Sequence, residues 1–386
     1  MRAIISGAGI SGLTLARCLA DDGWSVTVVE RAPGLRDEGY MIDFFGSGFD
    51  VAERLALLPR LREKSYTVHQ VEFCGAAGEP QASISYDAIR DALKGKLLSL
   101  MRGDLERVLF ETLPPGVSLR YGSRIEKIEN GRGGARAILN DGAVLDADLI
   151  AGADGVHSAV RELAFGPERD YFRDLGMRVG IYLFRDPAIT PKLASRFPLM
   201  SVTGRMAGFF ALRDGRIMAF FVHAGTEQAP CADPAAILRE KFGDLGWVVP
   251  AALAHLGQSP IYFDAVAQIE MPHWYKDRAV LVGDACAAVS LLAGQGASLG
   301  MAMSYVLAEE LRNAGDVPAG LARYEDRLRN EFAKKQKAAR GFANSFIPMT
   351  QGQLAIRNIV LRAARLPVLS RLVTPLFLAG SESVIR

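Results

Sequence analysis

The sequence predicts an α/β protein in which a domain built on a parallel sheet is interrupted by an inserted domain with an antiparallel sheet. Three observations lead to this fold class. Residues 1–31 follow a strand–turn–helix–strand pattern, the unit of a parallel sheet. Residues 168–268 carry the alternating strands and tight turns of an antiparallel sheet. The parallel-strand pattern returns at Val280-Leu281-Val282.

Composition and charge describe a globular protein with a substantial core. The chain has 386 residues, of which 49% are hydrophobic and 23% are charged. It carries 45 Lys and Arg residues against 43 Asp and Glu residues, a net charge of +2. We therefore expect no nucleic-acid partner, because proteins that bind nucleic acid usually carry a basic excess or a basic stripe.

Cysteine and apolar patterns bear on location. The four cysteines show no CxxC spacing, and their scatter favours a reducing, cytoplasmic compartment. The N-terminus lacks the apolar region of a signal peptide, and no run of about 18 uncharged apolar residues predicts a membrane span. We therefore expect no stable membrane insertion. The five histidines lack the spacing of metal ligands, so we expect no metal.

The first turn carries the strongest chemical signal. Gly7-Ala8-Gly9-Ile10-Ser11-Gly12 is a GxGxxG pattern between an apolar strand and a segment with helical spacing. Gly7 permits a tight turn, Gly9 lets the backbone approach a pyrophosphate, and Gly12 lets helix and strand pack closely. Glu30 ends the next strand, where an acidic residue binds a ribose in such sites. The pattern predicts a dinucleotide site at the start of the helix.

The elements before residue 168 are mixed. Residues 32–100 are loop-rich, with a helix expected near 48–57 and a strand near 68–74. The later patterns predict a helix over 104–113, a meander of strands over 117–121 and 134–146, and a buried strand over 149–151.

The inserted region and the segment after it have clearer patterns. Alternation predicts a strand over 179–184, and a turn at Arg213-Asp214-Gly215-Arg216 predicts a hairpin of the strands 207–212 and 217–223. Helical spacing follows over 297–311 and, with many charged residues, over 320–343.

Two further motifs follow buried strands: Asp154-Gly155-Val156-His157-Ser158-Ala159-Val160-Arg161 and Gly283-Asp284. With the GxGxxG turn, in this order and at this separation, they resemble the class A flavin-dependent aromatic hydroxylases, the para-hydroxybenzoate hydroxylase-like family. The resemblance extends from Met1 to about Arg340. In length the chain is similar to salicylate hydroxylase and to the tetracycline-inactivating monooxygenases.

The resemblance implies the activity. It implies an FAD-dependent monooxygenase that consumes NADPH or NADH as a transient co-substrate and hydroxylates an aromatic or polyketide-like small molecule with O₂, through a flavin C4a-hydroperoxide. The alternatives are an FAD-dependent oxidase or reductase of the same fold without oxygen transfer, and a flavin-binding protein without catalysis. A monomer or a homodimer is expected.

The resemblance also implies the domain organisation. A discontinuous FAD-binding domain of the glutathione-reductase type is expected over 1–167 and 269–345, with part of 40–100 on the substrate side. The antiparallel substrate domain is expected over 168–268, and a C-terminal helical segment over 346–386.

Several cofactor contacts are implied by the resemblance. Asp284 would accept a hydrogen bond from a ribitol hydroxyl, and the glycine-rich segment after it would provide a helix start beside the negative charge of reduced flavin. Arg102 matches the family arginine that opens a helix beside FAD. The full expected set is Gly7, Gly9, Ile10, Ser11, Gly12, Glu30, Arg31, Arg36, Arg102, Asp154, Asp284, Gly294, Gly296, Ala297 and Ser298.

The sequence departs from the family near the expected pocket. A usual Pro-Pro pair is replaced by Ser290-Leu291, and a usual Asn is Ser298. Aromatic residues in the inserted domain suit a water-free pocket, although any one of them has an ordinary core role as its alternative. The expected pocket residues are Tyr182, Phe209, Phe221, Leu291 and Leu292.

A catalytic base is expected near these aromatic residues. His223 ends a hairpin strand beside Phe220 and Phe221, and a base there would raise the electron density of a phenolic substrate. The alternative is a structural histidine with satisfied hydrogen bonds.

The C-terminal stretch 353–380 is both apolar and basic. It is either an amphipathic helix that lies on a membrane or contacts a hydrophobic substrate, or a helix that caps the two domains. We expect the capping helix, because Pro367 and Pro375 would break a long interfacial helix.

Overall fold

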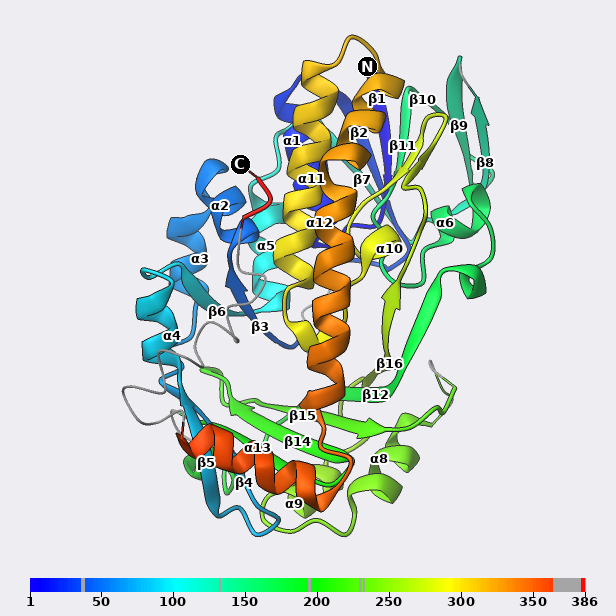
Figure 1. Ribbon diagram of the computed structural model, residues 1–386. Coiled ribbons are helices and arrows are strands. Elements are labelled where there is room, and N and C mark those ends of the chain that lie inside the picture. Colours follow the sequence, from blue (N-terminus) through cyan, green and yellow to red (C-terminus); the bar gives the residue numbers. More distant parts are fainter. Residues whose placement is uncertain are drawn as a thin grey trace.

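The computed structural model describes residues 1–35, 39–131, 133–193, 196–228, 231, 233–363 and 383–385. Figure 1 shows two layered parts joined by long strands and by the helix α12 (Val317–Phe346). The fold class is α/β, as the sequence predicted.

A six-stranded sheet organises the first part. Its strands, in spatial order, are β17 (Tyr275–Lys276), β18 (Ala279–Leu281), β11 (Leu149–Gly152), β1 (Arg2–Ser6), β2 (Ser25–Glu30) and β7 (Val117–Tyr121). All neighbours are parallel except β17 and β18. Apolar residues of β1 such as Ile5 are fully buried, because this sheet is covered on both faces.

The two faces of the six-stranded sheet have different covers (Figure 1). The helices α1 (Ile10–Asp21) and α11 (Gly296–Asn313) pack together on one side, where Ser304 Oγ donates a hydrogen bond to Ser11 O at 2.8 Å. The other side carries the antiparallel strands β8 (Ile125–Gly131), β9 (Gly134–Leu139) and β10 (Val144–Ala147), with the helix α6 (Ala159–Ala164) nearby.

Strand β7 corrects one expectation. Residues 117–121 were expected to join a meander with 134–146, but they pair in parallel with β2, for example Val28 with Leu119. The meander consists of β8, β9 and β10. Local alternation identifies a strand but not its partner, which depends on contacts distant in sequence.

A seven-stranded sheet forms the second part. Its order is β16 (Tyr262–Ile269), β12 (Phe172–Phe184), β15 (Ile217–Ala224), β14 (Arg205–Ala211), β13 (Phe197–Val202), β4 (Gln70–Cys74) and β5 (Pro80–Ser85). The pairs are antiparallel except β13 with β4. One face packs against α7 (Thr190–Leu193), α8 (Pro234–Phe242) and α9 (Val249–Ala254).

A smaller group of elements lies between the two sheets. The antiparallel pair of β3 (Met41–Phe45) and β6 (Leu97–Met101) adjoins the helices α2 (Ser47–Arg54), α3 (Leu58–Lys64), α4 (Tyr86–Ala92) and α5 (Arg102–Glu111). The short helix α10 (Asp284–Ala287) and the 3₁₀ turns at Glu168–Asp170 and Leu291–Ala293 complete the connections.

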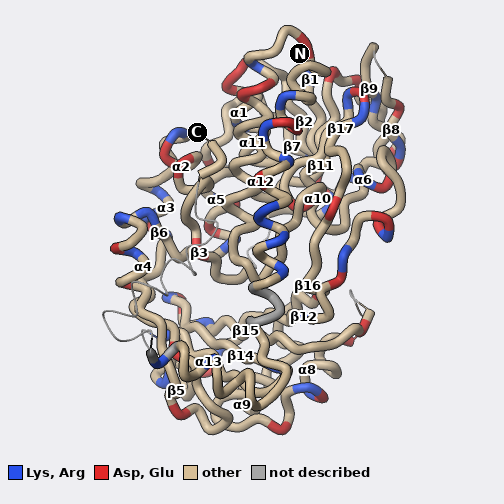
Figure 2. The backbone as a smooth tube through the Cα atoms, in the orientation of Figure 1, with Lys and Arg blue, Asp and Glu red and all other residues tan. Residues whose placement is uncertain are grey.

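The last described elements lie on the outside. In α12, Leu321, Tyr324 and Leu328 are fully buried, and Figure 2 shows Lys and Arg residues along its second half. Helix α13 (Gln351–Ala363) lies against the edge strand β5, where Arg362 Nε donates to Gln81 O at 2.7 Å. The stretch 353–380 was expected to cap the two domains, but α13 contacts the edge of the seven-stranded sheet; residues 364–380 lie outside the described part.

Candidate functional site

The glycine turn after β1 is shaped by close packing. Gly7 has a φ of +102°, and a Cβ on it would lie 2.5 Å from Ala153 O. A Cβ on Gly12 would overlap Gly7 O. Both positions therefore exclude any side chain, one through its backbone conformation and both through contact with neighbouring backbone.

Gly9 faces an open space. A Cβ on Gly9 would meet only the far ends of two side chains, Glu106 Oε1 at 3.4 Å and Arg102 Nη2 at 3.7 Å. Gly9 is also the N-cap of α1, and no side chain caps this helix. The unpaired N–H groups of the first turn therefore adjoin a space that an anion can enter.

A cavity of about 750 Å³ extends from this turn to the seven-stranded sheet. Seven residues of the expected cofactor set are in its lining: Gly7, Gly9, Glu30, Arg31, Arg102, Asp154 and Asp284. The lining does not include Ile10, Ser11 and Gly12 of α1, or Gly294, Gly296, Ala297 and Ser298 before and within α11. Arg36 lies outside the described residues.

Glu30 holds the turn and borders the cavity. Its carboxylate accepts hydrogen bonds from Ala8 N and Ala32 N, each at 2.8 Å. The acidic residue at the end of β2 therefore holds the backbone of the glycine turn and of the segment that follows β2.

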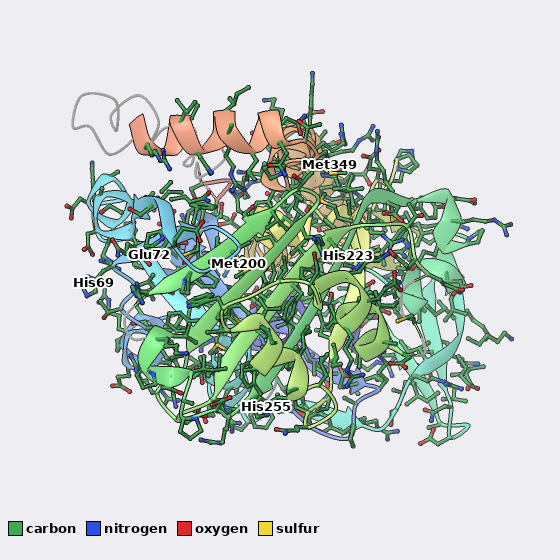
Figure 3. All side chains as sticks on the ribbon, turned by 90° about the horizontal axis from the view of Figure 1, so that it is seen from below. His69, Glu72, Met200, His223, His255 and Met349 are labelled. Carbon is green, nitrogen blue, oxygen red and sulfur yellow. The ribbon has the colours of Figure 1, made fainter. Side chains whose placement is uncertain are left out.

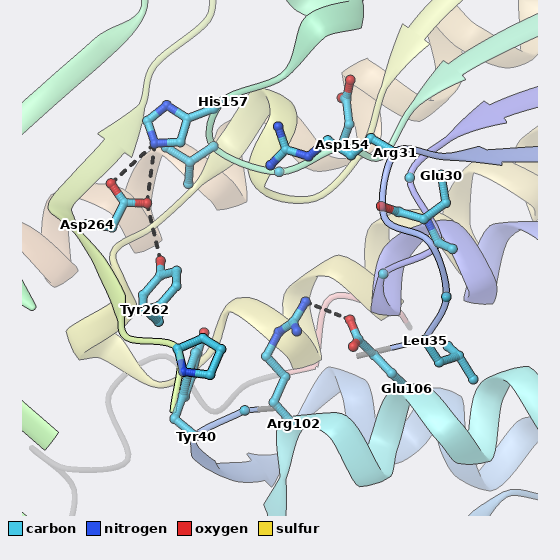
Figure 4. Close-up of a pocket in the computed structure, with 18 of the residues that line it drawn as sticks. Glu30, Arg31, Leu35, Tyr40, Arg102, Glu106, Asp154, His157, Tyr262 and Asp264 are labelled. Atoms are coloured by element: carbon cyan, nitrogen blue, oxygen red, sulfur yellow. Dashed lines mark hydrogen bonds and ion pairs between the residues drawn. The ribbon is translucent and has the colours of Figure 1, made fainter. Parts of the chain in front are cut away.

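Arg102 and Glu106 form an ion pair at the cavity wall (Figure 4). Arg102 Nη2 lies 2.6 Å from Glu106 Oε1, and the Glu106 side chain is only 6% exposed. Arg102 N also donates to Tyr40 O at 2.9 Å, which ties the start of α5 to the segment before β3. Glu106 is absent from the sequence prediction, although its i,i+4 spacing from Arg102 could have identified it.

Asp154 organises the loop after β11. It accepts hydrogen bonds from Ser158 Oγ, from Val160 N at 3.1 Å and from Ser6 Oγ at 3.2 Å. Burial raises the pKa of its carboxyl, and these hydrogen bonds oppose that rise. The residue therefore braces the turn and also lines the cavity.

Asp284 lies where β18 ends. Burial raises the pKa of its carboxyl, and the positive charge of Arg102 opposes this rise. A Cβ on Gly296 would lie 3.6 Å from Asp284 Oδ1, so the start of α11 approaches this carboxylate closely. Ser298 in the same helix turn is buried, and its Oγ has no hydrogen-bond partner.

The far wall of the cavity carries a hydrogen-bonded chain that the sequence analysis missed. His157 Nε2 lies 3.2 Å from Asp264 Oδ1, and Tyr262 donates to Asp264 Oδ2 at 3.3 Å (Figure 4). His157 Nδ1 lies 2.9 Å from Glu168 Oε1. The hydrogen bond to Asp264 raises the pKa of His157 to about 9, with a further contribution from Glu168 and against the effect of burial. His157 is therefore a cation at neutral pH.

Of the three aromatic residues expected in the pocket, Tyr182 is in the cavity lining, and Phe209 and Phe221 are not. Phe209 and Phe221 lie in the core between the seven-stranded sheet and α8 and α9, where Phe221 is 4.8 Å from Phe242, measured between ring centroids. Tyr182 stacks on Phe221, and its hydroxyl donates to Ala252 O at 2.7 Å. Although Tyr182 reaches the cavity edge, these three side chains belong to the face that points away from the six-stranded sheet.

His223 lies on the same outer face and is not placed as a catalytic base (Figure 3). Its ring lies 6.1 Å from that of Phe242, and its Nδ1 is 3.1 Å from Ala224 O. Burial lowers the pKa of His223, so its ring is neutral. The sequence alone could not choose between faces, because both faces of this strand are apolar.

The alternate residues form the inner face. We call this cluster the apolar layer; its members include Ile181, Phe210, Met218, Phe220, Val222, Leu291 and Leu292. Leu291 and Leu292 were expected in the pocket; they contribute to this layer and are not in the cavity lining. Ser290 before them has φ 123° and ψ 136°, a backbone region nearly restricted to glycine.

The described residues lack two further kinds of feature. They contain no helix that is long and apolar enough to cross a membrane. They also contain no group of three or more His, Cys, Asp or Glu side chains placed to hold a metal ion.

Known proteins resemble this chain in both sequence and structure. Residues 1–190 match a family model described as FAD binding domain. The protein MT1298 of Mycobacterium tuberculosis (strain CDC 1551 / Oshkosh) is 32% identical over 332 residues, which cover 83% of this chain and 88% of that protein. The flavin-dependent monooxygenase eupH of Phoma sp is 30% identical over 336 residues, which cover 81% of this chain and 77% of that protein.

Among solved structures, the tetracycline destructase Tet(55) has a TM-score of 0.82 and 25% sequence identity. The match covers 99% of this chain and 97% of that chain. The similarity in fold therefore includes both sheets. The match of residues 1–190 to an FAD binding domain agrees with a chain that binds FAD. On this basis the chain belongs to the family of FAD-dependent monooxygenases.

Proposed function

We propose that this FAD-dependent monooxygenase oxidises NADPH or NADH and hydroxylates an aromatic or polyketide-like small molecule with O₂. The observation that carries the proposal is the cavity, which connects the glycine turn to Tyr40 and Ile181 at the edge of the apolar layer. Bound FAD supplies what side chains lack, the ability to accept hydride and to activate oxygen. The residues of this chain bind, orient and exclude water.

The first part of the cavity fits an elongated dinucleotide. The space that Gly9 leaves open adjoins the free N–H groups of α1, which would bind the pyrophosphate. Glu30 would contact the adenosine ribose, and Asp284 would accept a hydrogen bond from a ribityl hydroxyl. Arg102, held by Glu106, would add positive charge beside the phosphates or the ribityl chain.

The outer part of the cavity supports transient docking of the reduced nicotinamide dinucleotide. Its lining includes Arg31 and Arg124 from the first domain and Arg185 and Arg216 from the second. Guanidinium groups bind phosphate oxygens in a planar fork. The sequence has no second GxGxxG turn after a strand, which favours a co-substrate that binds and leaves over a permanent second nucleotide.

The apolar layer supports an aromatic or polycyclic substrate. Phe210, Met218 and Phe220 are large apolar side chains on the inner face, and Leu291 and Leu292 belong to the same cluster. Such a surface excludes water. Without this exclusion, the activated oxygen would be lost as hydrogen peroxide before it reaches the substrate. The similarity to a tetracycline destructase makes tetracycline the first polycyclic compound to test.

The free cysteines support the cytoplasmic location that we propose. Cys18, Cys74 and Cys286 are buried thiols, and Cys231 is a half-buried one. Thiols that are not paired in disulfides are typical of a reducing compartment.

The test separates the proposal from its alternatives. Purified holoenzyme is mixed anaerobically with NADPH or NADH, with and without phenols, quinones and tetracycline, and flavin bleaching is recorded. The reduced enzyme then receives ¹⁸O₂, and products are analysed by mass. We expect reduction by at least one nicotinamide dinucleotide and a product that carries one ¹⁸O atom. Reduction that always ends in hydrogen peroxide would indicate an oxidase or reductase, and no bleaching would contradict the proposal.

A further inference from the structure

The helix α13 turns polar side chains toward the protein. Arg357 lies over the ring of Phe73 on β4, with 4.9 Å between the guanidinium carbon and the ring centroid. Asn358 Nδ2 donates a hydrogen bond to Gln81 Oε1 on β5 at 2.6 Å. A surface helix of a globular protein usually packs its apolar side chains on the core and turns its polar side chains outward. In this part of α13 the arrangement is reversed.

The outward side of α13 is apolar. Ile356 and Ile359 are each 64% exposed, and Val360 is exposed as well. Their i, i+3, i+4 spacing places them on one side of the helix. Met349 is also exposed, and its N–H donates to Gln353 Oε1 at 2.7 Å at the start of α13. We call this surface the apolar patch; it contains half of the exposed large hydrophobic side chains of the described residues, namely Met349, Ile356, Ile359 and Val360.

The sequence around the apolar patch is basic. Residues 332–381 contain eight Lys or Arg residues and no Asp or Glu. The whole chain carries a net charge of only +2, so the remaining residues are net acidic. Lys334 and Lys337 are exposed on the second half of α12, where Figure 2 shows the basic residues. Figures 1 and 3 place α13 and the end of α12 on the same face of the molecule, so this face combines apolar side chains with cations.

We propose that the apolar patch binds the surface of a membrane that contains anionic phospholipids. The apolar side chains of a helix that lies along a membrane enter the boundary between headgroups and acyl chains, and nearby Lys and Arg residues are attracted to anionic headgroups. At 13 residues, α13 is too short to cross a bilayer and would lie along its surface. Pro367 and Pro375, which would interrupt a longer interfacial helix, follow the end of α13 in the sequence.

Charge distinguishes a membrane from a second copy of the chain as the partner. In a symmetric dimer the same surface occurs on both subunits, so the apolar patch would face its own copy. The cations beside the patch would then face cations, and like charges across an interface oppose association. The cytoplasmic leaflet of a membrane has a negative surface potential, which is complementary to this face. It also agrees with the cytoplasmic location proposed above.

The apolar patch lies away from the outer end of the cavity. That end is lined by Gln258, and 3.0 Å separates Gln258 Oε1 from His255 Nδ1. Figure 3 shows Met349 of the patch and His255 at opposite edges of the view. A membrane bound at α13 would therefore leave this end of the cavity in contact with water, so we expect membrane binding and the flavin reaction to be compatible.

Vesicle sedimentation tests the proposal with the holoenzyme. Sucrose-loaded vesicles are made from phosphatidylcholine alone or from equal amounts of phosphatidylcholine and phosphatidylglycerol. The flavin absorbance that sediments with the vesicles gives the bound fraction at each lipid concentration. We expect an apparent Kd at least about tenfold lower for the anionic vesicles. Concentrated salt should weaken this binding, because salt screens exposed charges.

Two double variants separate the apolar contribution from the charged one. Ile356→Gln with Ile359→Gln should raise the Kd for anionic vesicles at least about tenfold, because two large apolar side chains no longer enter the lipid. Lys334→Gln with Lys337→Gln should raise it by about fivefold or more and reduce the effect of salt. The matched control is Leu163→Gln, which replaces an exposed apolar residue on the helix α6 and should leave the Kd unchanged.

Three results would overturn the inference. The first is equal affinity of wild type for the two kinds of vesicle, or no binding to either. The second is unchanged vesicle binding by the flavin-loaded variant Ile356→Gln, Ile359→Gln. The third is a wild-type dimer in sedimentation velocity that this variant converts to a monomer, which would assign the apolar patch to a second copy. Flavin content and anaerobic bleaching by NADPH or NADH, measured on the same preparations, test the proposed function separately.

Discussion

His157 and Asp264 connect the parts of the fold that carry the six-stranded and the seven-stranded sheet: Nε2 of His157, in the loop after β11, lies 3.2 Å from Oδ1 of Asp264 on β16. The hydrogen bond with Asp264, strengthened by Glu168, raises the pKa of His157 from 6.5 to about 9. A raised pKa in the folded protein means that the protonated pair stabilises the fold. The pair is thus an ionic contact between the two parts of the fold at neutral pH.

Replacing His157 with Asn should produce a pH-dependent loss of stability. The contribution of His157 is complete below pH 6.5 and is lost as the pH rises toward 9. Because the His157 side chain is 32% exposed, we expect a loss of only about 1–2 kcal/mol at pH 6.5, and a negligible loss above pH 9. Urea unfolding of both proteins over this range measures the difference.

The control for that variant is His69→Asn. His69 forms a similar pair with Asp87, but its side chain is 58% exposed and solvent screens the interaction. We expect only a small change in stability. A His157→Asn variant with the same stability difference at every pH would contradict the assignment of a cationic His157.

Alanine at Gly9 and alanine at Gly12 should have different effects, one on FAD binding and the other on stability. Gly9→Ala should fold normally, because its Cβ meets only the ends of the Glu106 and Arg102 side chains, but it should weaken FAD binding by roughly tenfold by obstructing the approach of the pyrophosphate. Gly12→Ala should destabilise the fold by about 1–3 kcal/mol through overlap with Gly7 O. Flavin content, Kd for FAD and thermal unfolding distinguish the two effects.

Gly116→Ala is the matched control for the turn, because nothing lies within 4 Å of its added Cβ. It should change neither FAD affinity nor stability appreciably. If Gly9→Ala binds FAD as tightly as wild type, the pyrophosphate does not lie against this turn.

The Arg102–Glu106 pair should show strong coupling. Arg102→Met leaves the nearly buried Glu106 carboxylate without its cation, so we expect a loss of about 3 kcal/mol in stability together with weaker FAD binding. The double variant Arg102→Met, Glu106→Leu should regain part of that stability and none of the FAD affinity. A double-mutant cycle from denaturant unfolding measures the coupling.

The exposed pair of Arg124 and Glu126 provides the comparison. These side chains are 68% and 48% exposed at an N–O distance of 2.9 Å, so Arg124→Met should cost less than about 1 kcal/mol. Similar losses for Arg102→Met and Arg124→Met would argue against a structural role of the first pair.

Neighbouring phenylalanines test which face of the sheet meets the ligand. Phe209 and Phe210 both lie in cores, on opposite faces of β14, so either substitution by Ala should cost about 3–5 kcal/mol. Only Phe210→Ala should raise the Kd of 1-naphthol, by about fivefold or more, because Phe210 belongs to the apolar layer. Titration of each flavin-loaded variant with 1-naphthol, followed by the flavin absorption spectrum, measures the Kd. An effect of Phe209→Ala alone would reverse the assignment of faces.

Local sequence patterns predicted several elements of the part of the fold that carries the six-stranded sheet. The unit of residues 1–31 is confirmed as β1, α1 and β2, because a short apolar strand, a glycine turn and helical spacing are local signals. The helix expected over 297–311 is confirmed as α11 for the same reason. Strand β7 was assigned the wrong partner, since pairing with β2 depends on contacts distant in the chain.

Some residues of the candidate site could likewise be predicted from local motifs, and others could not. Gly9 was located because the tight turn needs a glycine there, and Asp284 was located through the resemblance of its motif to a known family; both line the cavity. Asp264 was missed, because it is a single acidic residue whose role depends on side chains brought near it by folding, whereas Glu106 could have been found from its i,i+4 spacing to Arg102. Spacing within the sequence carries little record of such encounters.

The amino-acid sequence by itself determined the fold class, the dinucleotide turn and the membership suggested by three separated motifs. Those properties come from backbone conformations and residue periods that act over a few neighbouring positions. Only the tertiary structure decided which face of β15 meets the first domain. A strand with apolar residues on both sides, such as Phe220 and Phe221, has no local reason to prefer either face; packing against α8 on one side and β3 on the other makes the choice.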